Sequence, residues 1–387
     1  MIDILSPRQN KFGFYQVGDF RTYSKIEAVE QQVKTGQKMH WNFNQEVYSS
    51  YDWTVEPTES LSELYRQRAQ QLRDQYDHLV LWYSGGADSA TILSTFIDND
   101  IKLDEVASYI NYEATSDKFN YLNGEIFHVA VPTIKQAKEK QPWIEHTIID
   151  ITKATLDVFQ EKSAKFDWIY QVNHYVNPNA ISRRDIKLKI PHWVKMFDAG
   201  KKVGFIYGID KPRVIGLNGK YYARFVDMLD NAVSVECQMA NRAWEFNELF
   251  YWEPTNPKIV IKQSHVIKNY LKLATPTSKY ITDDQKLAST VTTSINAKMY
   301  WLTMPGLHTL IYPGWYPVPY QSKPPSVLFT SRDTWFFNLP DSEPAKYSWR
   351  VGLEHRWKTA PDFLKRDTSD ISKGFKNTSS IPYYLGT

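Results

Sequence analysis

Hydrophobic and polar positions give the middle of the chain an alternation of strands and helices that the two ends lack. Short apolar runs of strand length occupy 78–84, 106–110, 126–131, 144–149 and 203–207. Between them, apolar residues recur at helical spacing in four segments: 88–98, the segment that follows 131 and ends near 140, 152–162 and 180–199. Strands that alternate with helices predict a parallel sheet with right-handed crossovers. We therefore expect an α/β fold with a doubly wound parallel sheet.

Two capping boxes mark helices that precede this sheet. Residues 12–23 alternate around a Gly-Asp pair, which predicts a β-hairpin. Ser24 and Glu27 then form a capping box for a helix that ends near residue 36. Ser60 and Glu63 form a second one, for a helix that leads into the first strand.

After about residue 224 the alternation degrades. Helical patterns at 239–250 and 262–273 are followed by the Pro- and aromatic-rich 312–325, which we expect to be extended or irregular. The sequence therefore predicts three parts: a hairpin and helix addition (1–56), the parallel-sheet domain (57–224) and an aromatic-rich region for a substrate or partner (225–387).

Composition narrows the possible functions. A chain of 387 residues is long for a single hydrophobic core. Its formal net charge of +3 is too small to indicate a polyanionic partner by itself. The single cysteine, Cys237, excludes an intramolecular disulfide, a four-cysteine zinc site and chemistry that needs two thiols. No apolar run approaches transmembrane length, and no basic segment with an apolar core opens the sequence. We expect a cytoplasmic protein without a membrane partner.

The most informative chemistry follows the first strand, in the run Ser84-Gly85-Gly86-Ala87-Asp88-Ser89. The two glycines allow a sharp turn and a close backbone approach to a ligand. Ser84, Ser89 and the free N–H groups of the following helix can hold anionic oxygens at the positive end of the helix dipole. Asp88 would repel phosphates unless a cation lies between them, which favours Mg²⁺.

This run lacks the lysine of a Walker A loop and the Gly-x-Gly-x-x-Gly of a dinucleotide fingerprint. It resembles the pyrophosphate loop of the N-type ATP pyrophosphatases, the PP-loop superfamily that includes the synthetase domain of asparagine synthetase. The resemblance implies a HUP-like fold of the adenine nucleotide alpha hydrolase type. It also implies ATP as a substrate and Mg²⁺ as a cofactor. In that family the loop grips the β and γ phosphates while a substrate oxygen attacks the α phosphate, which yields an adenylate and pyrophosphate.

The same resemblance extends to a second loop, which follows the strand 203–207. There Gly208 would contact phosphate, and Asp210 would join Asp88 as a metal ligand. Lys211 and Arg213 would act with Asp88 in catalysis by neutralising the leaving pyrophosphate. A simple turn with two solvated basic residues is the alternative. Adenine is expected near the end of the second strand, at 108–111.

A basic stretch within 183–202 leaves nucleic acid open as a partner. It contains Arg183, Arg184, Lys187, Lys189, Lys195, Lys201 and Lys202, against Asp185 and Asp198. A solvated helix face explains the same charges. Cys237 and His174 are better explained by packing than by catalysis.

We therefore expect an ATP-dependent ligase-like enzyme, similar to the synthetase domain of asparagine synthetase without its glutaminase domain. Such an enzyme adenylates a carboxylate or carbonyl oxygen, releases pyrophosphate and transfers the product to an amine or ammonia. The acceptor substrate is not encoded in these patterns. Two alternatives remain: a PP-loop enzyme that modifies a nucleobase in DNA or tRNA, and a nucleotide-binding regulator without turnover.

Overall fold

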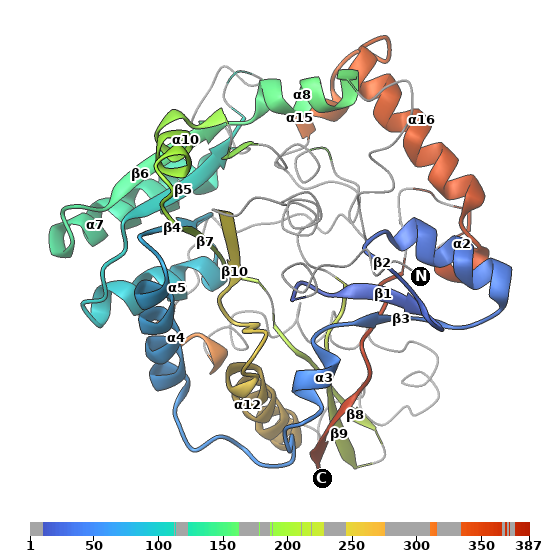
Figure 1. Ribbon diagram of the computed structural model, residues 1–387, viewed down its shortest axis with the longest axis horizontal. Helices are drawn as coiled ribbons and strands as arrows, with labels where there is room; N and C mark the ends of the chain where they lie inside the picture. Colours follow the sequence, from blue (N-terminus) through green and yellow to red (C-terminus); the bar gives the residue numbers. More distant parts are fainter. Residues whose placement is uncertain are drawn as a thin grey trace.

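A five-stranded parallel sheet organises the molecule (Figure 1). The computed structural model describes residues 11–111, 113, 123–161, 178, 186–187, 189–209, 211–217, 219–227, 245–274, 310–315, 334–365, 368–369, 371 and 376–387. The strand order is β10-β7-β4-β5-β6. The strands are β4 (His78–Trp82), β5 (Glu105–Ile110), β6 (Glu145–Asp150), β7 (Val203–Tyr207) and β10 (Glu245–Leu249). This confirms the expected α/β class with a parallel sheet.

The strand order reverses between β4 and β7. Strands β5 and β6 lie on one side of β4, whereas β7 and β10 lie on its other side. All four neighbouring pairs are parallel, so their carboxyl ends lie at one edge of the sheet. Such a reversal opens a crevice at the carboxyl ends of the two central strands, where open α/β sheets bind their ligands.

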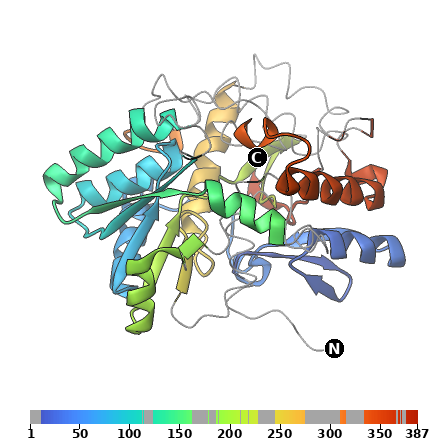
Figure 2. The ribbon, with the colours of Figure 1, turned by 90° about the horizontal axis from the view of Figure 1, so that it is seen from above.

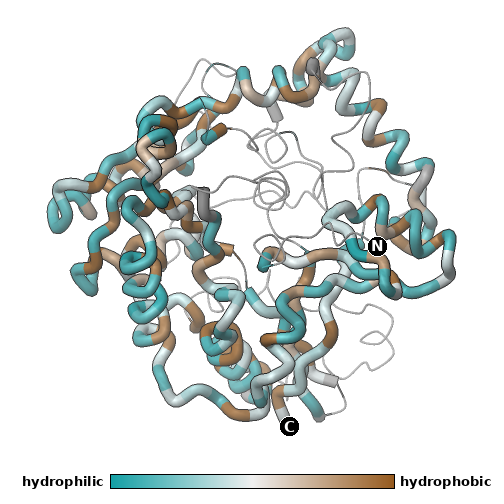
Figure 3. Tube along the Cα trace, in the orientation of Figure 1, coloured by the Kyte–Doolittle hydropathy of each residue, from teal (hydrophilic) through white to brown (hydrophobic). Residues whose placement is uncertain are grey.

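Helices cover both faces of this sheet (Figure 2). On one face Trp193 packs edge-on against Trp82 and Phe205. On the other face Gly204 lies so close to Tyr76 that a Cβ there would be 2.7 Å from the ring's Cγ. The helices are α4 (Leu61–Gln75), α5 (Ala87–Asp98), α7 (Val131–Lys140), α8 (Thr152–Glu161), α10 (Pro191–Asp198) and α12 (Lys258–Ala274). Figure 3 shows α4 as mostly hydrophilic with isolated hydrophobic positions, as expected for a helix with one buried side.

The amino-terminal part forms the predicted hairpin and helices. Strands β1 (Phe14–Val17), β2 (Phe20–Thr22) and β3 (Met39–Asn42) make an antiparallel sheet, flanked by α2 (Lys25–Thr35) and α3 (Gln45–Tyr48). Ser24 accepts a hydrogen bond from the Glu27 amide at 3.4 Å, as predicted. The predicted capping box is only half formed, because the Ser24 amide donates to the Thr22 hydroxyl and that hydroxyl, in place of the Ser24 amide, donates to the Glu27 carboxylate. Ser60 and Glu63 bond reciprocally, as a capping box does.

The carboxyl-terminal part contributes the last strand of a third sheet and contains further helical elements. Its last strand, β11 (Tyr383–Gly386), pairs with β9 (Lys220–Arg224), which pairs with β8 (Arg213–Leu217). The remaining elements are α15 (Thr334–Phe337), α16 (Pro344–Thr359) and η6 (Asp362–Leu364). Both the third sheet and the five-stranded sheet thus contain strands from either side of the boundary predicted at residue 224.

Two predicted elements are wrong. Residues 126–131, expected as a strand, form the π-helical turn η1 (Ile126–Ala130), which continues into α7. In this turn Ile126 and Ala130 are buried, a spacing of four that belongs to a helix, and short apolar runs do not distinguish the two by themselves. Residues 245–249, expected within a helix, form β10.

The strand β10 was not predicted because two of its buried residues, Asn247 and Glu248, are polar. Asn247 accepts a hydrogen bond from Lys187 on one face of the sheet. Glu248, on the other face, accepts hydrogen bonds from Lys11 at 3.0 Å, Arg68 at 3.0 Å and Tyr76 at 2.5 Å. Burial alone would raise the pKa of the Glu248 carboxyl, but Lys11 and Arg68 lower it overall. Glu248 therefore stays charged and joins the edge strand to α4.

We predict that Glu248→Gln destabilises the protein by about 3–5 kcal/mol, because the change leaves Arg68 buried without its charged partner. The free energy of unfolding is measured by urea denaturation. The pKa of Glu248 is depressed in the folded protein. Its contribution to the free energy of unfolding is therefore fully present above the pKa of a glutamate in the unfolded chain, about 4.3. The difference between wild type and variant should therefore shrink as the pH falls through the folded pKa.

The matched control is Glu59→Gln, which removes a carboxylate that pairs with Lys258 at the protein surface. We expect a loss below about 1 kcal/mol, as for other exposed ion pairs. Equal losses for the two variants would contradict the role assigned to Glu248.

Candidate functional site

The Gly-Gly run forms a tight loop at the carboxyl end of β4. Ser84 follows the strand, Gly85 has a φ of +86°, and Gly86 is the N-cap of α5. A Cβ at Gly85 would lie 3.1 Å from a methyl carbon of Val129, so both the conformation and the space favour glycine. Gly86 supplies no side chain to cap the first turn of α5, so the positive end of this helix dipole faces the loop without a side-chain cap.

The two serines of the loop bond to its backbone. The hydroxyl of Ser84 accepts a hydrogen bond from the Gly86 amide at 3.4 Å, and that of Ser89 donates to the Gly86 carbonyl at 3.2 Å. Ser89 also accepts from the Ser84 amide at 3.4 Å. These bonds are at the long end of the usual range, so the hydroxyls can rotate towards a stronger anionic acceptor.

The second predicted loop lies directly against the first. Gly208 follows β7, and a Cβ there would lie 3.1 Å from the amide nitrogen of Ser89 and 3.2 Å from the carbonyl carbon of Asp88. The two loops therefore meet backbone to backbone at the carboxyl ends of β4 and β7. A glycine is needed here for close approach.

Asp88 and Lys211, predicted from separate motifs, form an ion pair. The Lys211 ammonium lies 2.5 Å from Oδ1 of Asp88, and the Tyr312 hydroxyl donates to the same oxygen. The side chain of Lys211 is 8% exposed and that of Asp88 is 30% exposed. The alternative of a turn with a solvated lysine is thus excluded for Lys211.

Three buried tyrosines surround Asp88, and the sequence did not predict them. Tyr251 donates to the carbonyl oxygen of Asp88 at 2.7 Å, and its ring lies 5.3 Å from that of Tyr312 and 5.2 Å from that of Tyr65. Burial, with the nearby Asp88 charge, raises the pKa of Tyr251 and Tyr312 well above 10. Both hydroxyls therefore stay protonated and act as neutral donors. Tyr312 is 224 residues from Asp88, so local patterns carry no sign of this contact.

The other predicted residues have less defined positions. Arg213 begins β8 and is half-buried, whereas Asp210 lies outside the described residues. In the region expected to hold adenine, Ser108 and Asn111 are each 1% exposed. The amide of Asn111 donates to the Asn123 side chain at 2.9 Å.

The basic stretch is partly buried. Lys187 is 1% exposed and its ammonium lies 4.3 Å from the centre of the Phe205 ring, so it is not a surface cation. Lys189, Lys195, Lys201 and Lys202 are exposed. The helix expected at 180–199 is wrong in extent: α10 covers only 191–198, and Ile190 before it is extended. Arg183, Arg184, His174 and Cys237 lie outside the described residues.

A scan against protein-family models finds no match, and a search of curated proteins finds no similar sequence. Within the described residues, every helix is too short or too polar to cross a membrane.

We predict that Gly208→Ala lowers the stability by about 1–3 kcal/mol, because its Cβ presses on the backbone at the start of α5. Gly216→Ala serves as the control, since the atoms nearest its Cβ belong to the side chain of Tyr221 and can shift. Melting temperatures of the two variants give the comparison. A Gly208→Ala protein as stable as Gly216→Ala would mean that the two loops are not in close contact.

Proposed function

We propose that the chain is an ATP-dependent ligase-like enzyme of the PP-loop type that cleaves ATP between the α and β phosphates. The observation that carries this proposal is the Ser-Gly-Gly-Ala-Asp-Ser loop at a strand-order reversal, with the buried Lys211 against it. The motif resembles the pyrophosphate loop of PP-loop enzymes. We propose accordingly that the parallel-sheet domain has a HUP-like fold. We infer that the β and γ phosphates bind to the first-turn N–H groups of α5.

Lys211 supplies the positive charge for the leaving group. Without nucleotide its ammonium is neutralised by Asp88. When phosphates enter the loop, Lys211 exchanges part of this contact for phosphate oxygens, and charge builds up on those oxygens as pyrophosphate leaves. A fixed cation at that point lowers the barrier. Tyr312 and Tyr251 keep Asp88 oriented through its Oδ1 and its carbonyl oxygen.

The donor set at the loop fits a Mg²⁺ ion that arrives with the nucleotide. Within the described residues, no group of three potential metal ligands lies at this loop. Mg²⁺ commonly takes one or two carboxylates together with substrate phosphates and water, and Asp88 provides one. Asp210, outside the described residues, is the candidate for the second. The ion would neutralise charge on the phosphates.

The second step would transfer the adenylated carboxylate or carbonyl to an amine or ammonia. A nucleobase in DNA or tRNA is the competing acceptor, and the exposed Lys189, Lys195, Lys201 and Lys202 favour it. Lys187 does not, since it is buried. A regulator that binds ATP without turnover is the third possibility, and the product measurement below separates it from both enzymes.

We predict AMP and pyrophosphate as products. The full chain is incubated with ATP, Mg²⁺ and ammonium in the presence of pooled amino acids, or with tRNA or DNA, and phosphorus-containing products are separated by ion-exchange chromatography. AMP and pyrophosphate that depend on one acceptor pool support the proposal and identify the acceptor class. ADP and orthophosphate as the sole products would exclude it, and ATP binding without any turnover would favour the regulator.

We predict that Lys211→Met weakens ATP binding about tenfold or more and leaves AMP binding unchanged, because the lysine serves the β and γ phosphates. Isothermal titration with both nucleotides measures the difference. Lys201→Met, an exposed lysine that precedes β7, is the control for loss of one positive charge. If Lys211→Met weakens ATP and AMP binding equally, the lysine does not contact the terminal phosphates.

Asp88→Asn should lower turnover by about two orders of magnitude, the scale of a lost transition-state charge contact. It should also lower the melting temperature, because Lys211 loses the carboxylate that neutralises it. The double variant Asp88→Asn/Lys211→Met should recover most of this thermal loss without recovering turnover. Unchanged turnover in Asp88→Asn would show that the carboxylate has only a structural role.

A further inference from the structure

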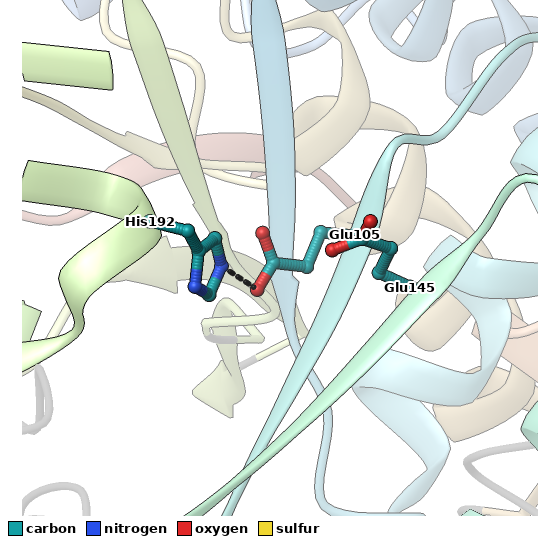
Figure 4. A group of neighbouring side chains, drawn as sticks. All are labelled: Glu105, Glu145 and His192. Atoms are coloured by element: carbon teal, nitrogen blue, oxygen red, sulfur yellow. Dashed lines mark hydrogen bonds and ion pairs between the residues drawn. The ribbon is translucent and has the colours of Figure 1, made fainter. Parts of the chain in front are cut away.

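A second cluster of polar side chains lies at the amino ends of the parallel strands, opposite the end that carries the phosphate loop (Figure 4). Glu105 and Glu145 are the first residues of β5 and β6, and His192 lies in the first turn of α10. Glu105 and Glu145 are direct neighbours in the parallel register. The cluster is therefore separated from the phosphate loop, which lies at the carboxyl ends of the strands.

The potential ligand atoms of Glu105, Glu145 and His192 all lie within 4.8 Å of one another. Nε2 of His192 is 3.0 Å from Oε1 of Glu105. In Figure 4 the Glu105 side chain lies between the other two residues. Two ligands at about 2.0–2.2 Å from an ion are about 3–3.5 Å apart, so small adjustments of side-chain torsions would bring these donors around one ion.

The Glu105 carboxylate is fixed by other residues. Trp193 donates to its Oε2 at 2.8 Å and Thr147 donates to its Oε1 at 2.5 Å, while Nε2 of His78 lies 2.9 Å from Oε2. Burial alone would raise the pKa of Glu105, but these hydrogen bonds lower it overall. The carboxylate is thus oriented and anionic although it is 0% exposed. Outer hydrogen bonds of this kind position metal-binding carboxylates.

Glu145 places a second carboxylate beside this buried anion. Among the residues that the structure describes, its carboxylate has no hydrogen-bond or ion-pair partner. Two carboxylates so close together repel each other, and a shared cation relieves the repulsion. The imidazole of His192, which is 37% exposed, adds a nitrogen donor on the accessible side.

We propose that Glu105, Glu145 and His192 bind a divalent transition-metal ion of the Zn²⁺ type. One imidazole nitrogen and two carboxylate oxygens are a donor set that suits Zn²⁺ and Co²⁺ better than Mg²⁺, which prefers oxygen alone. The ion replaces the hydrogen bond between Nε2 of His192 and Glu105, and a neutral ring that ligates through Nε2 carries its proton on Nδ1. Water completes the coordination.

The ion has a structural role. It joins β5 and β6 to α10, the helix that packs on Trp82 and Phe205 and leads into β7. Its binding adds to the stability of the folded chain by mass action. This proposal does not rest on the proposed ligase function, because the two sites share no residue.

The test uses the full chain after treatment with a chelator. Co²⁺ is titrated while its visible absorption is recorded, Zn²⁺ is then added as a competitor, and the melting temperature is measured with and without Zn²⁺. We expect one equivalent of Co²⁺ with a nitrogen- and oxygen-ligand spectrum, displacement by Zn²⁺, and a rise in melting temperature.

Glu145→Gln and His192→Asn remove one ligand each at accessible positions, so the fold should persist. Each should weaken Co²⁺ binding at least tenfold, and Thr147→Val should weaken it about 10–100-fold through the orientation of Glu105. Glu139→Gln on the exposed side of α7 is the matched control and should bind as the wild type does. Asp88→Asn should also bind normally, which separates this site from the phosphate loop.

Two results would overturn the proposal. One is the absence of saturable binding at metal concentrations up to about 100 μM Co²⁺ or Zn²⁺, which lies between millimolar and micromolar affinity. The other is equal binding in the wild type, Glu145→Gln and His192→Asn. In either case the hydrogen bonds to Glu105 alone hold this edge of the sheet.

Discussion

The contact between the ends of β4 and β7 is the constraint on which the candidate site depends. These strands are neighbours in the sheet, although more than a hundred residues separate them in sequence. Their pairing places Gly208 against the backbone of Asp88 and Ser89, so closely that a Cβ would require this backbone to shift by a few tenths of an ångström. Lys211, three residues further along the chain, can then reach Asp88. The ion pair is therefore a consequence of the strand order.

Buried carboxylates join the three parts that the sequence predicts. Asp227 accepts from Tyr15 at 2.7 Å, from Lys25 at 2.6 Å and from the Thr378 amide at 2.8 Å, so it holds the amino-terminal sheet to the end of the chain. Glu248 joins β10 to α4 in the same way. A buried charge tolerates few arrangements, since losing one partner leaves the other charge unpaired in a poor solvent. These contacts specify how the parts dock.

The predictable features of the sequence are those that depend on local spacing. The hairpin, both helix caps and the strands 78–82 and 203–207 follow from turn residues, capping residues and apolar runs within a few positions of one another. The Gly-Gly loop follows from the same kind of information. The strand β10 does not, because Asn247 and Glu248 are buried by partners on Lys187 and Arg68, which are distant in sequence. For the same reason Tyr312 was not among the expected site residues.

The tyrosines around Asp88 bear on the proposed phosphate site. A carboxylate in such a site would be a liability when no cation is bound, and here Lys211 and Tyr312 neutralise and hold it. On the proposed function, an entering nucleotide would therefore not meet a bare negative charge. It would meet a lysine already positioned at the loop, at the amino end of a helix that has no side-chain cap. Because tyrosine hydroxyls with raised pKa values stay neutral donors, they orient Asp88 without competing with Lys211 for the phosphate charge. The arrangement thus fixes the position of Lys211 before a ligand arrives, and on the proposed function such a fixed cation would need little reorganisation when charge develops on the phosphates.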